Sequence, residues 1–405
     1  MKFGGGYTFI CSQEAEYSHN AVENSNKIMA DKIINIFSFF SGAGFLDLGF
    51  ELEGHFDIVY VNEFHKAFDD IYKHSREKMG LHFPKYGHHV EDITKLMESK
   101  AMKELSVQIK ESKSQTLTGI IGGPPCPDFS VAGRNKGKEG ENGKLSGIYA
   151  NVICKTRPDF FLFENVKGLY RTAKHRAFFE QLKEQFRNNG YSLTEKLINA
   201  IEYGAPQERE RIILIGFHKT AIKKLKLKTQ HNELLGFNWD KYKQYTIEDI
   251  KSRPWPKISP CRLDTPIPMP EGIIPELTVQ YWWDKNDVEH HPNANMYFQP
   301  RAGLLRFETK DEGDDIKKCY KRLHRWRYSP TAAYGNNEVH IHPYKARRIS
   351  VSEALAIQSL PKEFELPTDI TLSDAFKTIG NGVPFLAANC IAKSLYDFIN
   401  SNSNE

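Results

Sequence analysis

The sequence has no two cysteines in C-x-x-C spacing, and its six cysteines are scattered along 405 residues. That pattern argues against a disulfide framework and against a thiolate zinc site, so each cysteine is expected to be a free thiol. No stretch approaches the ~20 apolar residues that a bilayer span needs, and the N-terminus lacks the charged start and apolar centre of a signal peptide. The sequence therefore predicts a cytoplasmic protein that makes no contact with a membrane.

Neither sign of charge predominates, because the formal net charge is only +4 and the pI is about 8.5. Such a balance is compatible with a polyanionic partner and equally with an ordinary enzyme, so any basic surface has to come from local clustering. No internal repeat or low-complexity tract is visible. With 40% hydrophobic residues the chain can bury a large core, and its length indicates two domains at roughly 150 residues per domain.

Apolar runs alternate with helical stretches from Ile33 to Phe217, beginning with "IINIFSFF", "FLDLGFELEG" and "FDIVYVNE". Strands separated by helices predict an α/β fold with a doubly wound, mostly parallel sheet. The rhythm stops after Phe217, where proline, basic and aromatic residues mix without a period. We expect an N-terminal arm (1–31), a catalytic domain (32–217), a smaller irregular domain (218–345), and a C-terminal segment (346–405) that completes the catalytic domain.

The turn "SGAG" follows the first predicted strand and opens a helix, which is typical of a nucleotide-binding turn. A dinucleotide fingerprint needs a third glycine, but Asp47 stands there and would repel a pyrophosphate. Glu63 follows about 20 residues later, where a carboxylate can bind two ribose hydroxyls. Adenosine without phosphate fits both features and points to S-adenosylmethionine, although a purely structural turn would show the same glycines.

Cys126 follows "GGPP" at the carboxyl end of a predicted buried strand, which is the ligand-binding edge of such a sheet. Prolines hold its thiol rigidly, whereas the other cysteines are read as small buried hydrophobes. Glu164 ends the next predicted strand, where partial burial would let it hold or donate a proton near neutrality. In "QERER", Arg209 and Arg211 alternate toward one side and could bind a carbonyl or phosphate oxygen, or could be a solvated charge run.

These segments together resemble the DNA (cytosine-5)-methyltransferase family, of the bacterial restriction-modification type. Six blocks stand in the family's order: "FSFFSGAGFLDLGF", "GGPPCPDFS", "ENVKGL", "QERER", "RRISVSEALAIQSLP" and "IGNGVPFLAA". The resemblance implies that Cys126 adds to C6 of a flipped-out cytosine while Glu164 engages N3. C5 then takes the methyl group of S-adenosylmethionine, which leaves as S-adenosylhomocysteine.

The resemblance also assigns binding residues, and it implies no metal. Arg211 would hold the cytosine carbonyl, with Arg209 supporting the site, and residues 218–345 would recognise the target sequence. The implied cofactor contacts are Phe40, Ser41, Gly42, Gly44, Glu63, Phe64, Asp92, Ile93, Pro125, Leu145, Asn381 and Val383. The expected DNA contacts are Ser130, Gln207, Arg325 and Arg327.

Two positions depart from the family pattern. Pro127 and Asp128 follow the catalytic cysteine where the family usually has glutamine, and "ENGKL" lacks the arginine often found before its glycine. The expected partner is double-stranded DNA, modified by a monomer at the site that a cognate restriction endonuclease cuts. A tRNA cytosine-5 methyltransferase of the same fold is the alternative. A nicotinamide oxidoreductase and a noncatalytic DNA-binding regulator fit the six blocks less well.

Overall fold

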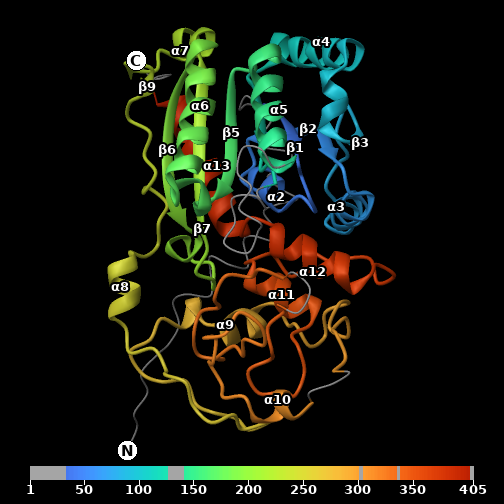
Figure 1. Cartoon of the computed structure of the whole chain (residues 1–405), viewed down its shortest axis with the longest axis vertical. Helices are drawn as coiled ribbons and strands as arrows, with labels where there is room; N and C mark the ends of the chain where they lie inside the picture. The colour runs from blue at the N-terminus through green and yellow to red at the C-terminus, as the bar shows by residue number, and fades with distance from the viewer. Residues whose placement is uncertain (1–32, 126–140, 301–303, 335–337, 402–405) are drawn as a thin grey trace, which may run out of the picture. The chain divides into compact units, whose positions relative to one another are not determined.

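The computed structural model describes residues 33–125, 141–300, 304–334 and 338–401, and one compact unit spans Ile34–Glu405. Its described residues contain a sheet of nine strands in the order β3-β2-β1-β4-β5-β7-β6-β9-β8 (Figure 1). The strands are β1 (Ile34–Phe39), β2 (Phe56–Glu63), β3 (His88–Val90), β4 (Thr118–Gly122), β5 (Phe160–Val166), β6 (Tyr191–Asn199), β7 (Glu210–His218), β8 (Thr229–Gln230) and β9 (Glu233–Leu234).

Most neighbouring strands run parallel. The pairs β2–β3, β1–β2, β1–β4, β4–β5 and β6–β9 are parallel, whereas β7 runs antiparallel to both β5 and β6. Parallel neighbours need crossover connections, and the helices between the strands supply them. The predicted α/β fold with a mostly parallel sheet is therefore confirmed.

Helices cover both faces of the sheet. One core cluster joins α4, α5 and α6 to the sheet, and a second joins α2, α7 and α13 to its other face; Figure 1 shows α5 and α6 in front of the strands and α13 behind them. The larger helices are α2 (Phe45–Glu51), α3 (Lys66–Lys78), α4 (Ser99–Gln115), α5 (Glu141–Thr156), α6 (Ala173–Asn188), α7 (Lys219–Leu225), α12 (Leu372–Asn381) and α13 (Phe385–Asn400).

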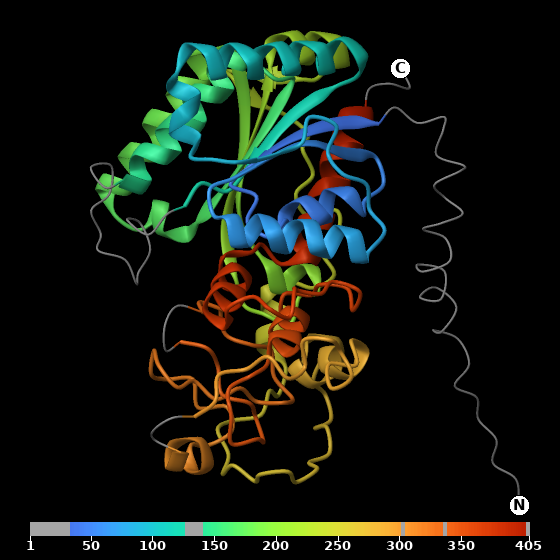
Figure 2. The same ribbon diagram turned by 90° about the vertical axis from the view of Figure 1, so that its right-hand side faces the viewer.

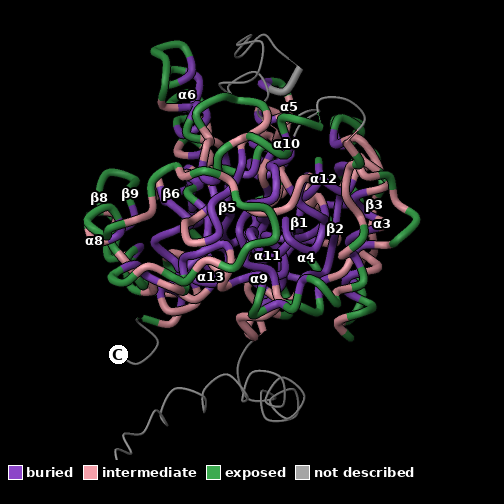
Figure 3. Tube along the Cα trace, turned by 90° about the horizontal axis from the view of Figure 1, so that it is seen from below, coloured by how far each residue is buried: buried purple, intermediate pink, exposed green. Residues whose placement is uncertain are grey.

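Burial on both faces explains the continuous apolar run at the start of β5. There, Phe160 and Leu162 pack in one cluster while Phe161 and Phe163 pack in the other. Side chains alternate between faces along a strand, so a strand segment covered on both sides favours apolar residues at successive positions. Figure 3 shows β1, β2 and β5 as buried tube enclosed by more exposed segments.

The carboxyl ends of β1, β2, β4 and β5 lie along one edge of the sheet. The chain leaves β1 toward β2 on one side, and leaves β4 toward β5 on the other, so the connections diverge between β1 and β4. A crevice outside the strand ends at such a divergence is where doubly wound folds bind ligands. The glycine turn follows β1 and the segment leading to Cys126 follows β4.

Between β9 and α12, the described residues hold only short regular elements. They include α8 (Ile247–Ser252), α9 (Val279–Lys285), α10 (Leu304–Thr309) and α11 (Val351–Ile357), drawn below the sheet in Figure 2. Four short 3₁₀ segments complete the described chain: η1 (Ile93–Met97), η3 (Lys167–Tyr170), η4 (Ala200–Tyr203) and η5 (Pro275–Leu277). β8 and β9 extend the sheet beyond residue 217, and the domain boundaries given above stay a prediction.

Helix α13, near the C-terminus, packs against α2. Asn389 in α13 donates a hydrogen bond of 3.0 Å to the carbonyl of Gly49 in α2. α13 therefore covers the helix that follows the glycine turn. No helix in the described ranges is both long and apolar enough to cross a bilayer.

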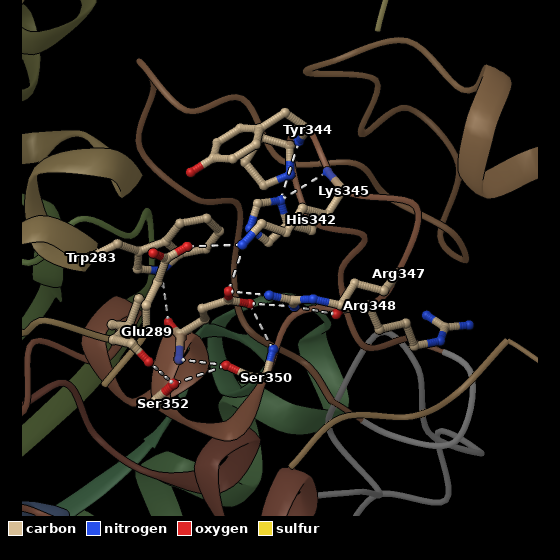
Figure 4. Close-up of polar contacts among 12 residues, drawn as sticks. Trp283, Glu289, His342, Tyr344, Lys345, Arg347, Arg348, Ser350 and Ser352 are labelled. Carbon is tan, nitrogen blue, oxygen red and sulfur yellow. Dashed lines mark hydrogen bonds and ion pairs between the residues drawn. The ribbon is translucent and has the colours of Figure 1, made fainter. Parts of the chain in front are cut away.

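A buried carboxylate joins residues 342–350 to α11 (Figure 4). Arg347 donates to Glu353 at 2.9 and 2.7 Å, and Ser350 completes a capping box with it. The Nδ1 atom of His342 accepts amide hydrogen bonds from Tyr344 and Lys345, so the proton is assigned to Nε2, 3.4 Å from Glu353. Burial opposes ionisation of Glu353, but His342 and Arg347 outweigh it and lower the pKa of its carboxyl.

We expect Glu353→Gln to lower the free energy of unfolding at pH 7 by about 3–5 kcal/mol, because it removes the buried carboxylate that pairs with the half-buried Arg347 and with His342. A lowered pKa in the folded state means that the unfolded chain binds protons first as the pH falls. The difference in the free energy of unfolding between wild type and Glu353→Gln should therefore shrink below about pH 4.5, as urea titrations at pH 7 and pH 4 would show.

The exposed Glu363 provides a matched control. Glu363→Gln should change the free energy of unfolding by less than about 0.5 kcal/mol. Equal effects of the two substitutions would contradict a structural role for the Glu353 network.

Candidate active site

The turn after β1 is locked to the end of β2. Gly42 and Gly44 adopt left-handed backbone angles, with φ of 57° and 76°. A Cβ on Gly44 would lie 2.4 Å from the ring of Tyr72, so this position requires glycine. The amides of Gly42 and His65 each donate a 2.8 Å hydrogen bond to the carboxylate of Glu63. Two amides therefore fix the carboxylate beside the turn.

The polar atoms around this turn fit a polar ligand. Burial raises the pKa of Glu63 above its usual value, although the amide hydrogen bonds oppose the rise; its oxygens retain lone pairs that can accept ribose hydroxyls. The hydroxyls of Ser41 and Thr378 are buried and have no hydrogen-bond partner among the described residues. A Cβ on Gly42 would lie 4.0 Å from the Thr378 hydroxyl. Buried polar groups are normally paired, so these two hydroxyls indicate a ligand site.

The other predicted cofactor contacts lie on neighbouring segments of the same edge. Phe64 follows β2 with 69% of its surface exposed, and Asp92 caps η1 by accepting from the amide of Thr94 at 2.8 Å. Asn381 is exposed at the end of α12, whereas Val383 is buried. Phe40 has a positive φ of 53° at the start of the turn. Three further predicted contacts are Ile93, buried in the core, and Leu145 and Pro125, both half-buried.

Asp47 does not face the turn as the sequence argument assumed. Its side chain is buried, accepts a 2.8 Å hydrogen bond from Ser38, and lies near Arg76, which pairs with Glu51 at 2.7 Å. Burial raises the pKa of Asp47 to about 7, and Arg76 only partly opposes the rise. The expected repulsion of a pyrophosphate by Asp47 is therefore wrong, because this carboxyl belongs to the core beneath α2.

Glu164 and Arg211 meet across the antiparallel pair of β5 and β7. Glu164 is paired in register with Ile213, and Arg211 lies two residues along on the same face of β7. The Nε atom of Arg211 lies 2.9 Å from Oε1 of Glu164, and both side chains are largely buried. Burial raises the pKa of Glu164, although the charges of Arg211 and Arg209 oppose it. The site thus holds a carboxyl that binds a proton more readily than an exposed glutamate.

The segment after β4 passes directly beside this carboxyl. A Cβ on Gly123 would lie 2.6 Å from Oε2 of Glu164, so glycine permits the close approach. Asn165 donates a 3.4 Å hydrogen bond to the carbonyl of Pro124, which attaches the end of β5 to the same segment. Cys126 and Ser130, two of the predicted site residues, lie outside the described residues. The described chain stops at Pro125, directly after the groups that surround Glu164.

Comparison with known proteins decides the family. Residues 34–397 match the profile of the C-5 cytosine-specific DNA methylases. The chain belongs to that family. It is 59% identical over 368 residues to the Type II methyltransferase M.NmeDI of Neisseria meningitidis serogroup C, covering 91% of this chain and 84% of the relative.

More distant relatives share the fold. The Type II methyltransferase M.FnuDI of Fusobacterium nucleatum is 29% identical over 372 residues, covering 89% of this chain and 94% of the relative. A candidate DNA modification methyltransferase encoded within an E. coli prophage superposes with a TM-score of 0.60 at 24% identity, covering 91% of this chain and 99% of that one. This protein is thus a DNA (cytosine-5)-methyltransferase of the bacterial restriction-modification type, as the sequence predicted.

Two of the polar residues in "QERER" brace this methyltransferase internally. Arg209 donates to the carbonyls of Ala332 and Gly380 at 2.8 and 2.7 Å. Gln207 is fully buried, donates to Gln358 at 3.1 Å and accepts from the amide of Ala332 at 2.9 Å. Both precede β7, which begins at Glu210, so the alternation expected along a strand does not apply to them. Of Gln207, Arg209 and Arg211, it is Arg211 that forms an ion pair with Glu164.

The two arginines expected to contact DNA differ in their surroundings. Arg325 is buried and donates to both oxygens of Glu312, at 2.9 and 3.0 Å, and to the carbonyl of Thr265 at 2.8 Å. Arg327 is half-buried, and its side chain makes no hydrogen bond or ion pair within the described ranges. Contact of either residue with DNA stays a prediction, and Arg325 already has a structural role.

Sequence reasoning missed Asn165 and Thr378. Asn165 stands beside Glu164 in "ENV", and an amide at the end of a buried strand was a signal that could have found it. Nothing in the sequence marks the Thr378 hydroxyl, because only folding brings α12 to the turn after β1. Among the described residues, no group of three or more His, Cys, Asp or Glu side chains is arranged to hold a metal ion.

Gly123→Ala should displace the Glu164 carboxyl, because the new methyl group would overlap Oε2. A shift of about 1 Å at a reacting group can lower turnover roughly 100-fold, and we expect a loss of that order in the transfer of labelled methyl groups to DNA.

Gly147→Ala in α5 is the control, because a Cβ there meets no atom within 4 Å. Both proteins should be compared by thermal melting before activity is measured. Full activity of a folded Gly123→Ala variant would show that the approach of Gly123 to Glu164 is unimportant.

Proposed function

We propose that this enzyme transfers a methyl group from S-adenosylmethionine to C5 of a cytosine in a specific short duplex sequence, through a covalent bond between Cys126 and C6. The observation that carries the proposal is the Glu164 carboxyl, held by Arg211 against the segment that leads from β4 to Cys126. A carboxyl that binds a proton readily, beside the segment that leads to a cysteine, supports a reaction that activates a pyrimidine ring.

Cytosine C5 is a weak nucleophile, so the reaction needs the thiol. The Cys126 thiolate forms a bond to C6, and the electrons of the C5–C6 double bond move into the ring as Glu164 engages N3. The methyl group, which S-adenosylmethionine carries on a sulfonium, is then bonded to C5. Loss of the C5 proton restores the double bond and expels the thiolate, so Cys126 is regenerated. Splitting the transfer in this way replaces one difficult step with easier ones.

Glu164 suits its assigned part because burial raises the pKa of its carboxyl. A protonated carboxyl donates a hydrogen bond to N3, and Arg211 beside it can donate to the cytosine carbonyl. N3 is engaged in base pairing within a duplex. The cytosine must therefore leave the stack before Glu164 can reach it, as is general for enzymes that modify bases.

S-adenosylmethionine is assigned to the turn after β1. Glu63 would accept hydrogen bonds from the ribose hydroxyls, and the unpaired hydroxyls of Ser41 and Thr378 would gain partners. The exposed ring of Phe64 offers an apolar face to the adenine. Further contacts follow from the family resemblance for Phe40, Gly42, Gly44, Asp92, Ile93, Pro125, Leu145, Asn381 and Val383.

The same proposal covers the enzyme's partners. It acts as a monomer on double-stranded DNA in the bacterial cytosol or nucleoid, and protects sites from a cognate restriction endonuclease that it need not touch. Residues 218–345 supply the sequence recognition. The tRNA alternative is not favoured, because the family profile and the 59% identical relative both concern DNA modification.

A duplex library containing 5-fluorocytosine tests the covalent step. Fluorine cannot leave C5 as a proton does, so incubation with S-adenosylmethionine should trap the enzyme on DNA as a band that survives denaturing electrophoresis. Cys126→Ser should abolish trapping, because a hydroxyl is a far weaker nucleophile. Cys319→Ser should trap normally, because Cys319 is exposed; the expectation that this cysteine is buried is wrong. Trapping by Cys126→Ser, or none by wild type, would refute the mechanism.

Glu164→Gln separates catalysis from binding. The amide keeps the size of the carboxyl but cannot supply its proton, so kcat should fall by about 10²–10⁴-fold while the Kd for DNA changes little. Single-turnover kinetics and a gel-shift titration measure the two quantities. Glu184→Gln, on the exposed side of α6, is the control. A change confined to KM would make Glu164 a binding residue instead.

A further inference from the structure

A groove opens among the irregular segments after β7. One side is formed by residues 255–258, including Trp255 and Lys257, and the other by Arg327 and Tyr328, with Asp315 also in its lining. The rings of Trp255 and Tyr328 meet edge to face with centroids 5.2 Å apart. The groove thus combines two aromatic rings with positively and negatively charged side chains.

Both sides of the groove rest on the connection between β6 and β7. Ser329, next to Tyr328, pairs with that connection through its amide to Pro206, at 2.8 Å, and through its carbonyl to the amide of Glu208, at 3.0 Å. Trp255 and Tyr328 pack on a small core that contains Ile201. The same connection continues into β7 and Arg211. The groove is therefore attached to the strand that carries part of the catalytic site.

Two charged groups of the groove are unpaired among the described residues, unlike the nearby Arg325, which does not line the groove. Arg325, two residues before Arg327, spends its guanidinium on Glu312 and Thr265. The side chains of Arg327 and Asp315 have no hydrogen bond or ion pair to any described residue. A free guanidinium and a free carboxylate in one groove are available to a ligand.

We propose that this groove reads one G·C base pair of the target site, an inference that rests on the proposed function. Arg327 donates its forked N–H groups to O6 and N7 of guanine, and Asp315 accepts a hydrogen bond from N4 of the paired cytosine. These are the atoms that the two bases present in the major groove. Lys257 binds the phosphate backbone beside the pair.

The distance along the chain agrees with a short recognition site. Arg327 is two residues from Ser329, which pairs with Gln207, and Gln207 is four residues from Arg211. At about 3.4 Å per residue and about 4.8 Å between strands, Arg327 and Arg211 are at most about 25 Å apart along the backbone. That distance equals about seven base pairs at 3.4 Å each. Arg327 can therefore read a base pair close to the cytosine that is methylated.

Methylation of a randomised duplex library, read by sequencing of 5-methylcytosine, tests the groove. Arg327→Lys keeps the charge but loses the fork, so guanine preference should fall about 10- to 100-fold at one position, with an unchanged salt dependence of binding. Asp315→Asn should relax preference for the cytosine paired with that guanine. The double variant should relax that pair and no other.

Arg176→Lys is the matched control, because Arg176 is exposed on α6, outside residues 218–345 and outside the groove; its site preference should equal that of wild type. Failure of wild type to methylate any library member would overturn the proposed function itself. An active wild type with unaltered preference in Arg327→Lys would overturn only the groove assignment. Relaxed base preference at two positions that do not pair with each other would also contradict it, as would complete loss of methylation by a folded Arg327→Lys.

Discussion

The ion pair between Glu164 and Arg211 depends on the direction of β7, which runs antiparallel to β5. Because β7 runs against β5, the start of β7 meets the end of β5, and a residue from each can reach the other. A parallel strand in that place would put Arg211 at the opposite edge. The direction of β7 therefore gives the buried carboxyl a cationic partner at the edge where ligands bind.

The connection that precedes β7 links the pair of Arg211 and Glu164 to distant segments of the chain. Arg209 donates to the carbonyls of Ala332 and Gly380. Gln207 donates to Gln358, the residue that follows α11. Ser329 pairs with residues on either side of Gln207. Segments more than a hundred residues apart are thus fixed to the strand that carries Arg211, which keeps the proposed base-reading groove in register with the proposed site of methyl transfer.

The carboxyl groups near the turn after β1 also differ, because one lies at the edge of the sheet and the other lies in the core. Its glycines allow the backbone to approach Glu63, while the buried group beneath it, Asp47, bonds to Ser38. Burial raises the pKa of both carboxyls, but only Glu63 lies at the edge of the sheet. A carboxyl group only three residues after the glycine turn can thus belong wholly to the core.

The α/β fold, the family, the place of Glu63 at the end of β2 and that of Glu164 near the end of β5 could be predicted from the sequence, because apolar runs and glycine turns are local signals. The sequence could not separate Arg211 from Arg209, or Arg327 from Arg325, because identical side chains two residues apart differ only in what packs against them. Partners such as Ala332, Gly380 and Glu312 arrive from distant segments. Folding sets which charged groups brace the molecule and which stay unpaired among the described residues, because burial and pairing depend on long-range contacts.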